Sequence, residues 1–124
     1  MIHADTGKES DRFIEFAEYA LGILAREDYS SFIALFNSSR LTECDVILAL
    51  KYMDETRPAL KIDAPARIKS DAQRVYLTAY NDGSGYHMDY DLTTDGEIND
   101  LTIQIEFLKE KSGYTVVLDD LHTL

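Results

Sequence analysis

The sequence predicts an α+β protein in which about three N-terminal helices pack on a curved antiparallel sheet of four to five strands. Apolar residues recur at spacings of three and four in the first half of the chain, and they alternate with polar residues in the second half. Helices followed by a run of strands are typical of helices packed on one side of a sheet. With 124 residues, no repeat and no linker, we expect one domain, 1–124, with residues 1–9 flexible.

Three helices are expected in the first half. The first begins at Ser10, its predicted N-cap, and carries an apolar stripe through SDRFIEFAEYALGILARED. A short second helix follows with Asp28 as its cap, and the sequence NSS breaks it. The third runs from about Glu43 to Met53, because Thr42 and Asp45 have the spacing of a capping box.

Four main strands are expected in the second half, each identified by alternation of apolar and polar residues. The sequences NDGSG and KSG predict turns, and TTDGEIND predicts a longer polar loop. A weaker strand is expected from Leu60 to Asp63. The main strands are RVYLTAY (74–80), YHMDYDL (86–92), LTIQIEFLKE (101–110) and YTVVLDDL (114–121).

The charge of the chain narrows the classes of partner. The net charge is −11, from 12 Lys and Arg against 23 Asp and Glu, and no basic patch is visible. A field of this sign repels nucleic-acid phosphates and anionic membranes, whereas it accelerates encounter with a cationic protein. The alternative is that the charge only keeps the protein soluble. Self-association is left open.

The sequence also predicts a cytoplasmic location and no enzymatic activity. Cys44 is the single cysteine, so an internal disulfide is excluded, and neither a signal peptide nor an apolar run of about 20 residues is visible. Nucleotide-binding glycine loops, the nucleophile motif of hydrolases and a complete calcium loop are absent from the sequence. We therefore predict no catalytic residue, metal or cofactor.

An acidic stretch in the predicted sheet is the first candidate site. Its carboxylates could form a negative surface for a basic protein partner, such as a nuclease whose cleft holds phosphates. The alternative is a solvated loop beside a polar strand face. The candidate partner-binding residues are Asp82, His87, Asp89, Asp91, Asp95, Glu97 and Asp100.

Two further groups are candidates. The tyrosines of the first hairpin could line a ligand pocket, or could stabilise the hairpin as cross-strand aromatic pairs. They are Tyr76, Tyr80, Tyr86 and Tyr90.

The C-terminal sequence DDLHTL contains carboxylates and an imidazole, which suggest a metal site or an acid–base pair. Strand alternation predicts that Asp119 and Asp120 point to opposite faces and that Asp120 and His122 share one. A structural Asp120–His122 pair is the alternative to a metal site or an acid–base pair, and the sequence favours it because two ligands make an incomplete metal site.

Three features together resemble a known fold family: the helix pair around EDYSSF, the C-terminal NDLTIQIEFLKEKSGYTVVLDDLHTL, and the order of helices before sheet. They resemble small bacterial proteins of the cone-shaped α+β fold shared by nuclear transport factor two and ketosteroid isomerase. More narrowly, the C-terminus is similar to that of an uncharacterised subset ending in Asp-Asp-Leu/Ile-His. That fold group includes immunity proteins of contact-dependent growth inhibition. The catalytic residues of its enzymes do not map onto this sequence.

The leading functional hypothesis is therefore a non-enzymatic cytoplasmic immunity protein that neutralises a cationic, nuclease-type toxin through an acidic surface. One alternative is a ligand-binding or enzymatic pocket protein of the same fold. Another is a dimerisation module, because an exposed curved sheet can pair with a second copy.

Overall fold

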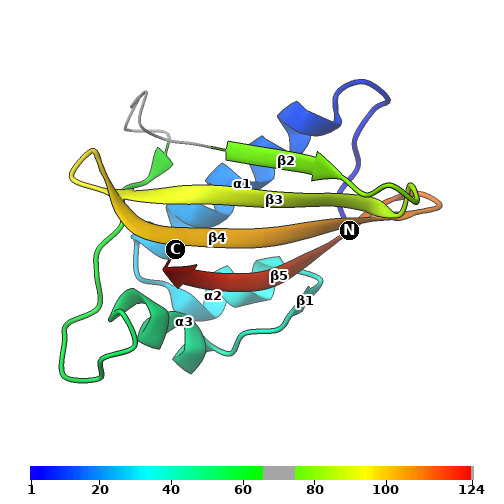
Figure 1. The fold of residues 1–124 in the computed structure, drawn as a ribbon. Coiled ribbons are helices and arrows are strands. Elements are labelled where there is room, and N and C mark those ends of the chain that lie inside the picture. The colour runs from blue at the N-terminus through cyan, green and yellow to red at the C-terminus, as the bar shows by residue number, and fades with distance from the viewer. Residues whose placement is uncertain (66–74, 124) are drawn as a thin grey trace.

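The described residues form three helices and a five-stranded sheet, which confirms the predicted α+β class (Figure 1). The computed structural model describes residues 1–65 and 75–123; Arg74 of the first predicted strand and Leu124 of the C-terminal sequence lie outside these ranges. The elements are α1 (Glu9–Ala25), α2 (Tyr29–Leu35), β1 (Ser38–Ser39), α3 (Glu43–Leu50), β2 (Val75–Ala79), β3 (Gly85–Thr94), β4 (Glu97–Glu110) and β5 (Gly113–Thr123).

The sheet has the strand order β1-β5-β4-β3-β2. The last four strands form an antiparallel meander in chain order, as the alternation predicts. β1 differs, because it pairs parallel to β5 and comes from the helical half of the chain. The three helices lie on one side of the sheet (Figure 1), so no helix from the described residues lies on the other side.

The helices differ from the prediction at two ends. α1 begins one residue before Ser10, and Lys8 occupies the N-cap position without a side-chain cap, so the predicted Ser10 cap is wrong. α3 ends at Leu50 rather than Met53, because Tyr52 and Met53 adopt left-handed φ angles of 54° and 62° that no helix accommodates. The caps predicted for α2 and α3 are confirmed: Asp28 accepts from the Ser31 N–H, and α3 begins with a complete capping box.

Residues 60–63 form no strand, so the strand predicted from Leu60 to Asp63 is wrong. The segment crosses the end of the sheet and is held there by isolated bonds. The Asp63 N–H donates to the Thr93 carbonyl, and the Thr94 hydroxyl donates to the Lys61 carbonyl. Two such bonds do not make a ladder, although the apolar–polar alternation of the segment is that of a strand.

The loop predicted at TTDGEIND is instead a tight hairpin turn. β3 runs to Thr94 and β4 starts at Glu97, so only Asp95 and Gly96 connect them. Both residues have positive φ angles, 53° and 81°, which is the geometry that Asp-Gly favours in two-residue hairpins. The Asp63 carboxylate accepts from both backbone N–H groups of this turn and so fixes it.

The core fills the space between the helices and the sheet. The Phe13 ring of α1 stacks on Phe107 of β4 with centroids 4.1 Å apart and meets Tyr114 of β5 edge-on at 4.9 Å. Aromatic pairs of this kind contribute about 1 kcal/mol each beyond the burial of their area. Met88, Ile103 and the other inward residues of β3 to β5 complete this layer. Among the described residues, no helix has the length and apolar character needed to cross a membrane.

The N-terminal residues also contact the sheet. Ile2 forms a β-bridge with Tyr114 through two backbone bonds of 2.9 and 2.7 Å, and the His3 ring contacts the Ser112 carbonyl. The prediction of flexibility for residues 1–9 did not include this pairing.

Candidate functional site

The side of the sheet that carries no helix is rich in carboxylates. Alternation directs every second side chain of β3, β4 and β5 to this side, because the intervening ones fill the core. We define the acidic face by five residues from these three strands: Asp89 and Asp91 of β3, Glu106 of β4, and Asp119 and Asp120 of β5. Only Asp89 and Asp91 belong to the acidic stretch predicted from the sequence.

The two β3 carboxylates are held by neighbouring strand residues. Asp89 Oδ1 accepts from Gln104 Nε2 at 2.8 Å, and His87 Nε2 lies 3.0 Å from the same oxygen. Asp91 is buried and accepts from the Thr102 hydroxyl at 2.8 Å. These bonds fix the carboxylates before any partner arrives, which reduces the ordering cost of binding.

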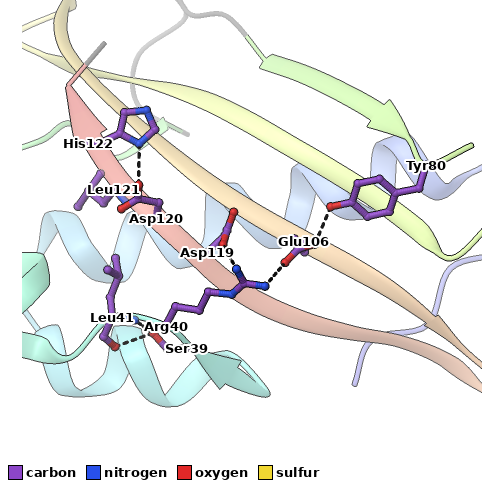
Figure 2. A network of polar contacts seen from close by, with 9 residues as sticks. All are labelled: Ser39, Arg40, Leu41, Tyr80, Glu106, Asp119, Asp120, Leu121 and His122. Atoms are coloured by element: carbon purple, nitrogen blue, oxygen red, sulfur yellow. Dashed lines mark hydrogen bonds and ion pairs between the residues drawn. The ribbon is translucent and has the colours of Figure 1, made fainter.

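Arg40 connects the β4 and β5 carboxylates. Its guanidinium lies 3.1 Å from Glu106 Oε1 and 3.1 Å from Asp119 Oδ1, and Figure 2 shows it bridging the two across the face. On the other side, the Tyr80 hydroxyl donates to Glu106 Oε2 at 2.6 Å. The Glu106 carboxylate is therefore bound at both oxygens, while the Arg40 side chain remains 65% exposed.

The environment of Tyr80 shifts its ionisation. Burial of the phenol raises the pKa of Tyr80 well above its ordinary value, and the hydrogen bond to Glu106 raises it further. Both effects disfavour a phenolate beside a carboxylate. Tyr80 thus stays a neutral donor, and it orients Glu106 rather than acting as a base.

The C-terminal carboxylates do not diverge as strand alternation predicts. A β-bulge shifts the register between β4 and β5, so that Gln104 faces Asp120 while Ile105 faces Leu118, and Asp119 is the extra residue. A bulge places two residues opposite one and so interrupts alternation. Asp119 reaches Arg40 on the acidic face, and Asp120 lies opposite Gln104 on the same side, so the predicted divergence is wrong (Figure 2).

The predicted contact between Asp120 and His122 is present. His122 Nδ1 lies 3.1 Å from Asp120 Oδ2, and Asp120 Oδ1 accepts from the Leu121 N–H at 2.9 Å. Within residues 1–65 and 75–123, no three His, Cys, Asp or Glu side chains are arranged to hold a metal ion.

The structure separates the acidic stretch into three places. His87, Asp89 and Asp91 lie on the middle of β3, whereas Asp82 lies in the β2–β3 turn, where it accepts from the Ser84 N–H. Asp95, Glu97 and Asp100 lie in and after the turn at the other end of β3. At about 3.3 Å per strand residue, the two turns are roughly 30 Å apart.

The four predicted pocket tyrosines lie on both sides of the sheet. Tyr76 is exposed opposite Asp89, and Tyr80 bonds Glu106 on the acidic face. Tyr86 packs against Phe13 in the core, and the buried Tyr90 donates to Glu18 of α1 at 3.0 Å. They do not converge on one cavity.

A groove of about 300 Å³ lies elsewhere, between α3 and the end of β5. Its walls are mainly apolar, and its polar rim includes Asp45, Asp120 and His122. Sequence reasoning missed this groove, because α3 and β5 are distant in the chain. It also missed Arg40 and Glu106, for which the only sequence signal was that Glu106 is a polar residue on the outward side of an alternating strand.

Together, the fold and the acidic face define a small α+β protein with one helix-covered sheet face and one carboxylate-rich sheet face. The chain belongs to the family described as a domain of unknown function (DUF7668), whose model matches residues 24–124. No curated protein and no solved structure shows a significant match to the chain. The match includes α2, α3 and the whole sheet, and therefore all the residues of the acidic face.

Proposed function

We propose that this chain is a non-enzymatic, cytoplasmic binding protein that presents its acidic face to a cationic protein partner. The observation that supports this function is the placement of five carboxylates from three strands on the side of the sheet that carries no helix. A net charge of −11 adds a long-range field of the same sign. Complementary fields raise association rates and discriminate against wrongly charged partners.

The partner that fits this surface best is a nuclease-type toxin domain, which makes the chain an immunity protein. A nuclease holds phosphates with Lys and Arg, so its cleft is cationic. An acidic protein seated on that cleft excludes the nucleic acid. The sequence resemblance to a fold group that includes immunity proteins of contact-dependent growth inhibition supports the same partner.

The fixed geometry of the acidic face favours binding over catalysis. Each of its five carboxylates has a hydrogen-bond or ion-pair partner, such as Gln104 for Asp89 and Arg40 for Asp119. Carboxylates used in proton transfer need access to a substrate held in a pocket. Here Asp120 alone borders the groove beside α3, and the four tyrosines proposed for a pocket point in different directions.

Two double variants, each of which neutralises two carboxylates at a different place on the molecule, test the proposal. The partner assayed is the protein encoded beside this gene. The double variant Asp89→Asn/Glu106→Gln removes two charges from the acidic face, while Glu15→Gln/Glu55→Gln removes two from exposed sites in α1 and the segment after α3. Both variants have the same net charge, so a difference between them reports on the face.

We expect the association rate, measured by stopped-flow mixing at low salt, to fall about fivefold in the first variant and less than about twofold in the second. Raising the ionic strength should slow association of the wild type, because salt screens the field. Equal effects of the two double variants, or an association rate that does not change with salt, would refute the acidic face as the binding surface.

A further inference from the structure

β5 has an open edge beyond its short pairing with β1. Ser39 is the last residue of β1 and pairs with Leu118, and the Arg40 N–H donates to the Leu118 carbonyl at 2.9 Å. The chain then leaves β5 to begin α3 at Glu43. Within the described ranges, residues 119–123 pair only with β4, so their other side has no strand neighbour.

A backbone N–H group at this edge is hydrogen-bonded to a side chain. The Leu121 N–H donates to the carboxylate of the preceding Asp120 rather than to another strand. In an antiparallel ladder, backbone groups alternate between the two sides of the strand, so the Thr123 N–H points to the same edge as that of Leu121. A row of N–H groups without a strand neighbour is a template for an added strand.

The groove of about 300 Å³ lies directly beside this edge, because its walls include Leu121 and Thr123 of β5. Its volume is at the lower end of the range for ligand pockets, which suits one or two side chains. Apolar groups line it, and Met53 at its wall is 70% exposed. The lining also includes Leu41, Leu48, Ala49 and Tyr52.

The backbone at the groove is strained. Tyr52 and Met53 are consecutive non-glycine residues with φ of 54° and 62°, a conformation that costs of order 1 kcal/mol or more per residue. The Tyr52 hydroxyl donates to the Asn99 carbonyl at 2.7 Å, and this bond holds the strained turn against the sheet. Tyr52 and Met53 both line the groove, so this turn forms part of its wall.

Charge decides which strand can be added. Asp45 of α3 and Asp120 of β5 lie at the groove, and Asp119 precedes Asp120 in the sequence. Two copies of this chain joined through their β5 edges would bring these carboxylates together, and like charges across a pairing destabilise it. A segment with basic residues beside an apolar one complements both the carboxylates and the apolar lining of the groove.

We propose that an extended segment of a cationic protein partner adds to the sheet along residues 119–123 of β5 and inserts an apolar side chain into the groove beside α3. A carbonyl of the added strand takes the Leu121 N–H from Asp120, and the freed carboxylate, with Asp45, pairs with basic side chains of the segment. Main-chain bonds then supply affinity, and the groove supplies selectivity for the inserted side chain. This inference rests on the proposed function only in taking the partner to be cationic.

A short capped peptide of alternating lysine and leucine residues is the probe, with a peptide of the same composition but grouped leucines as its control. The Thr123 N–H faces the open edge and makes no ladder bond to β4. Thr123→Pro removes this N–H, whereas Thr123→Val keeps it. Leu48→Lys places a charge in the groove, and Cys44→Lys makes the same charge change at an exposed α3 position outside it. Thermal melting of all four variants verifies folding.

Titration followed by amide chemical shifts should show changes concentrated at Leu121, Thr123 and Leu48. Affinity for the alternating peptide should fall about tenfold or more in Thr123→Pro and Leu48→Lys and should remain within about twofold in their controls. Shift changes confined to Asp89 and Glu106, with affinity unaffected by Thr123→Pro, would overturn the edge while leaving the acidic face as the binding surface. Absence of binding at roughly millimolar peptide would also overturn it, and the partner assay above judges the proposed function separately.

Discussion

Arg40 places one positive charge at the centre of an otherwise negative surface. Its guanidinium bridges Glu106 and Asp119, but its side chain is mostly exposed, so each ion pair contributes less than about 1 kcal/mol. The residue therefore has little effect on stability. Its consequence is positional: it holds two carboxylates from neighbouring strands at a spacing that fits one guanidinium.

Tyr80 gives a testable pH dependence. Burial and the bond to Glu106 raise the pKa of Tyr80 above its ordinary 10.0. Above about pH 10 the unfolded chain loses this proton while the folded chain keeps it, so the folded state binds more protons and its stability falls as pH rises. Tyr80→Phe removes this contribution. Urea denaturation should therefore show the stability difference between wild type and Tyr80→Phe shrinking from about pH 8 to about pH 11. A difference that stays constant over this range would contradict the shift.

Residue pairs close in sequence were predictable, and distant ones were not. The contact between Asp120 and His122 follows from a period of two along one strand. The orientation of Asp119 did not follow, because a bulge depends on how β5 matches β4 and leaves no local mark in YTVVLDDL. The Arg40–Glu106 contact joins residues 66 positions apart, so only the fold brings them together.

At the scale of elements, the start of α3 sets one wall of the groove. The Thr42 hydroxyl accepts from the Asp45 N–H at 3.2 Å, and the Asp45 carboxylate accepts from the Thr42 N–H at 2.8 Å. These two bonds satisfy N–H groups that the helix itself cannot pair. Because α3 has only eight residues, its position depends strongly on this cap.

We expect Thr42→Ala to lower the free energy of unfolding by about 1 kcal/mol, since the hydroxyl acceptor is lost. Thr42→Ser keeps the acceptor and should retain most of the stability. Chemical denaturation of the two variants beside the wild type measures both effects. Equal stability of the Ala and Ser variants would show that the capping bond does not contribute.

The elements with a periodic signal were predictable, and those without one were not. α1 spans 17 residues and β4 spans 14, so their apolar patterns repeat several times. β1 has two residues and exists because Asn37 and Arg40 bond the backbone of β5. The Asp95-Gly96 turn did carry a signal, the Asp-Gly pair, but the surrounding polar residues were interpreted as a longer loop.

At the scale of the molecule, the sheet converts a linear acidic stretch into a different surface. Asp82 and Asp95, which belong to the same acidic stretch of the sequence, lie at opposite ends of β3, whereas Asp89, Glu106 and Asp119 come from three strands and lie on one face. The α+β class and the helix-covered face were predictable, because they depend on the order and period of whole segments. The membership of the acidic face was not, because it depends on strand register.

The same surface determines whether two copies of the chain associate. Pairing through the carboxylate-rich sheet sides would oppose five carboxylates with five, and pairing through the β5 edges would bring Asp119 and Asp120 of both copies together. With a net charge of −11, repulsion acts before contact and is strongest at low ionic strength, where the Debye length is about 30 Å at 0.01 M salt.

We therefore expect sedimentation velocity at low salt to show a monomer over roughly a hundredfold range of protein concentration, because no second copy supplies the missing positive charge. Repeating the measurement near 1 M salt distinguishes charge repulsion from the lack of a self-complementary surface, since the Debye length then shrinks to about 3 Å. A dimer that appears only at high salt would show that charge alone keeps the copies apart. A concentration-dependent dimer at low salt would contradict the repulsion argument and would favour a dimerisation module over a protein that receives a cationic partner.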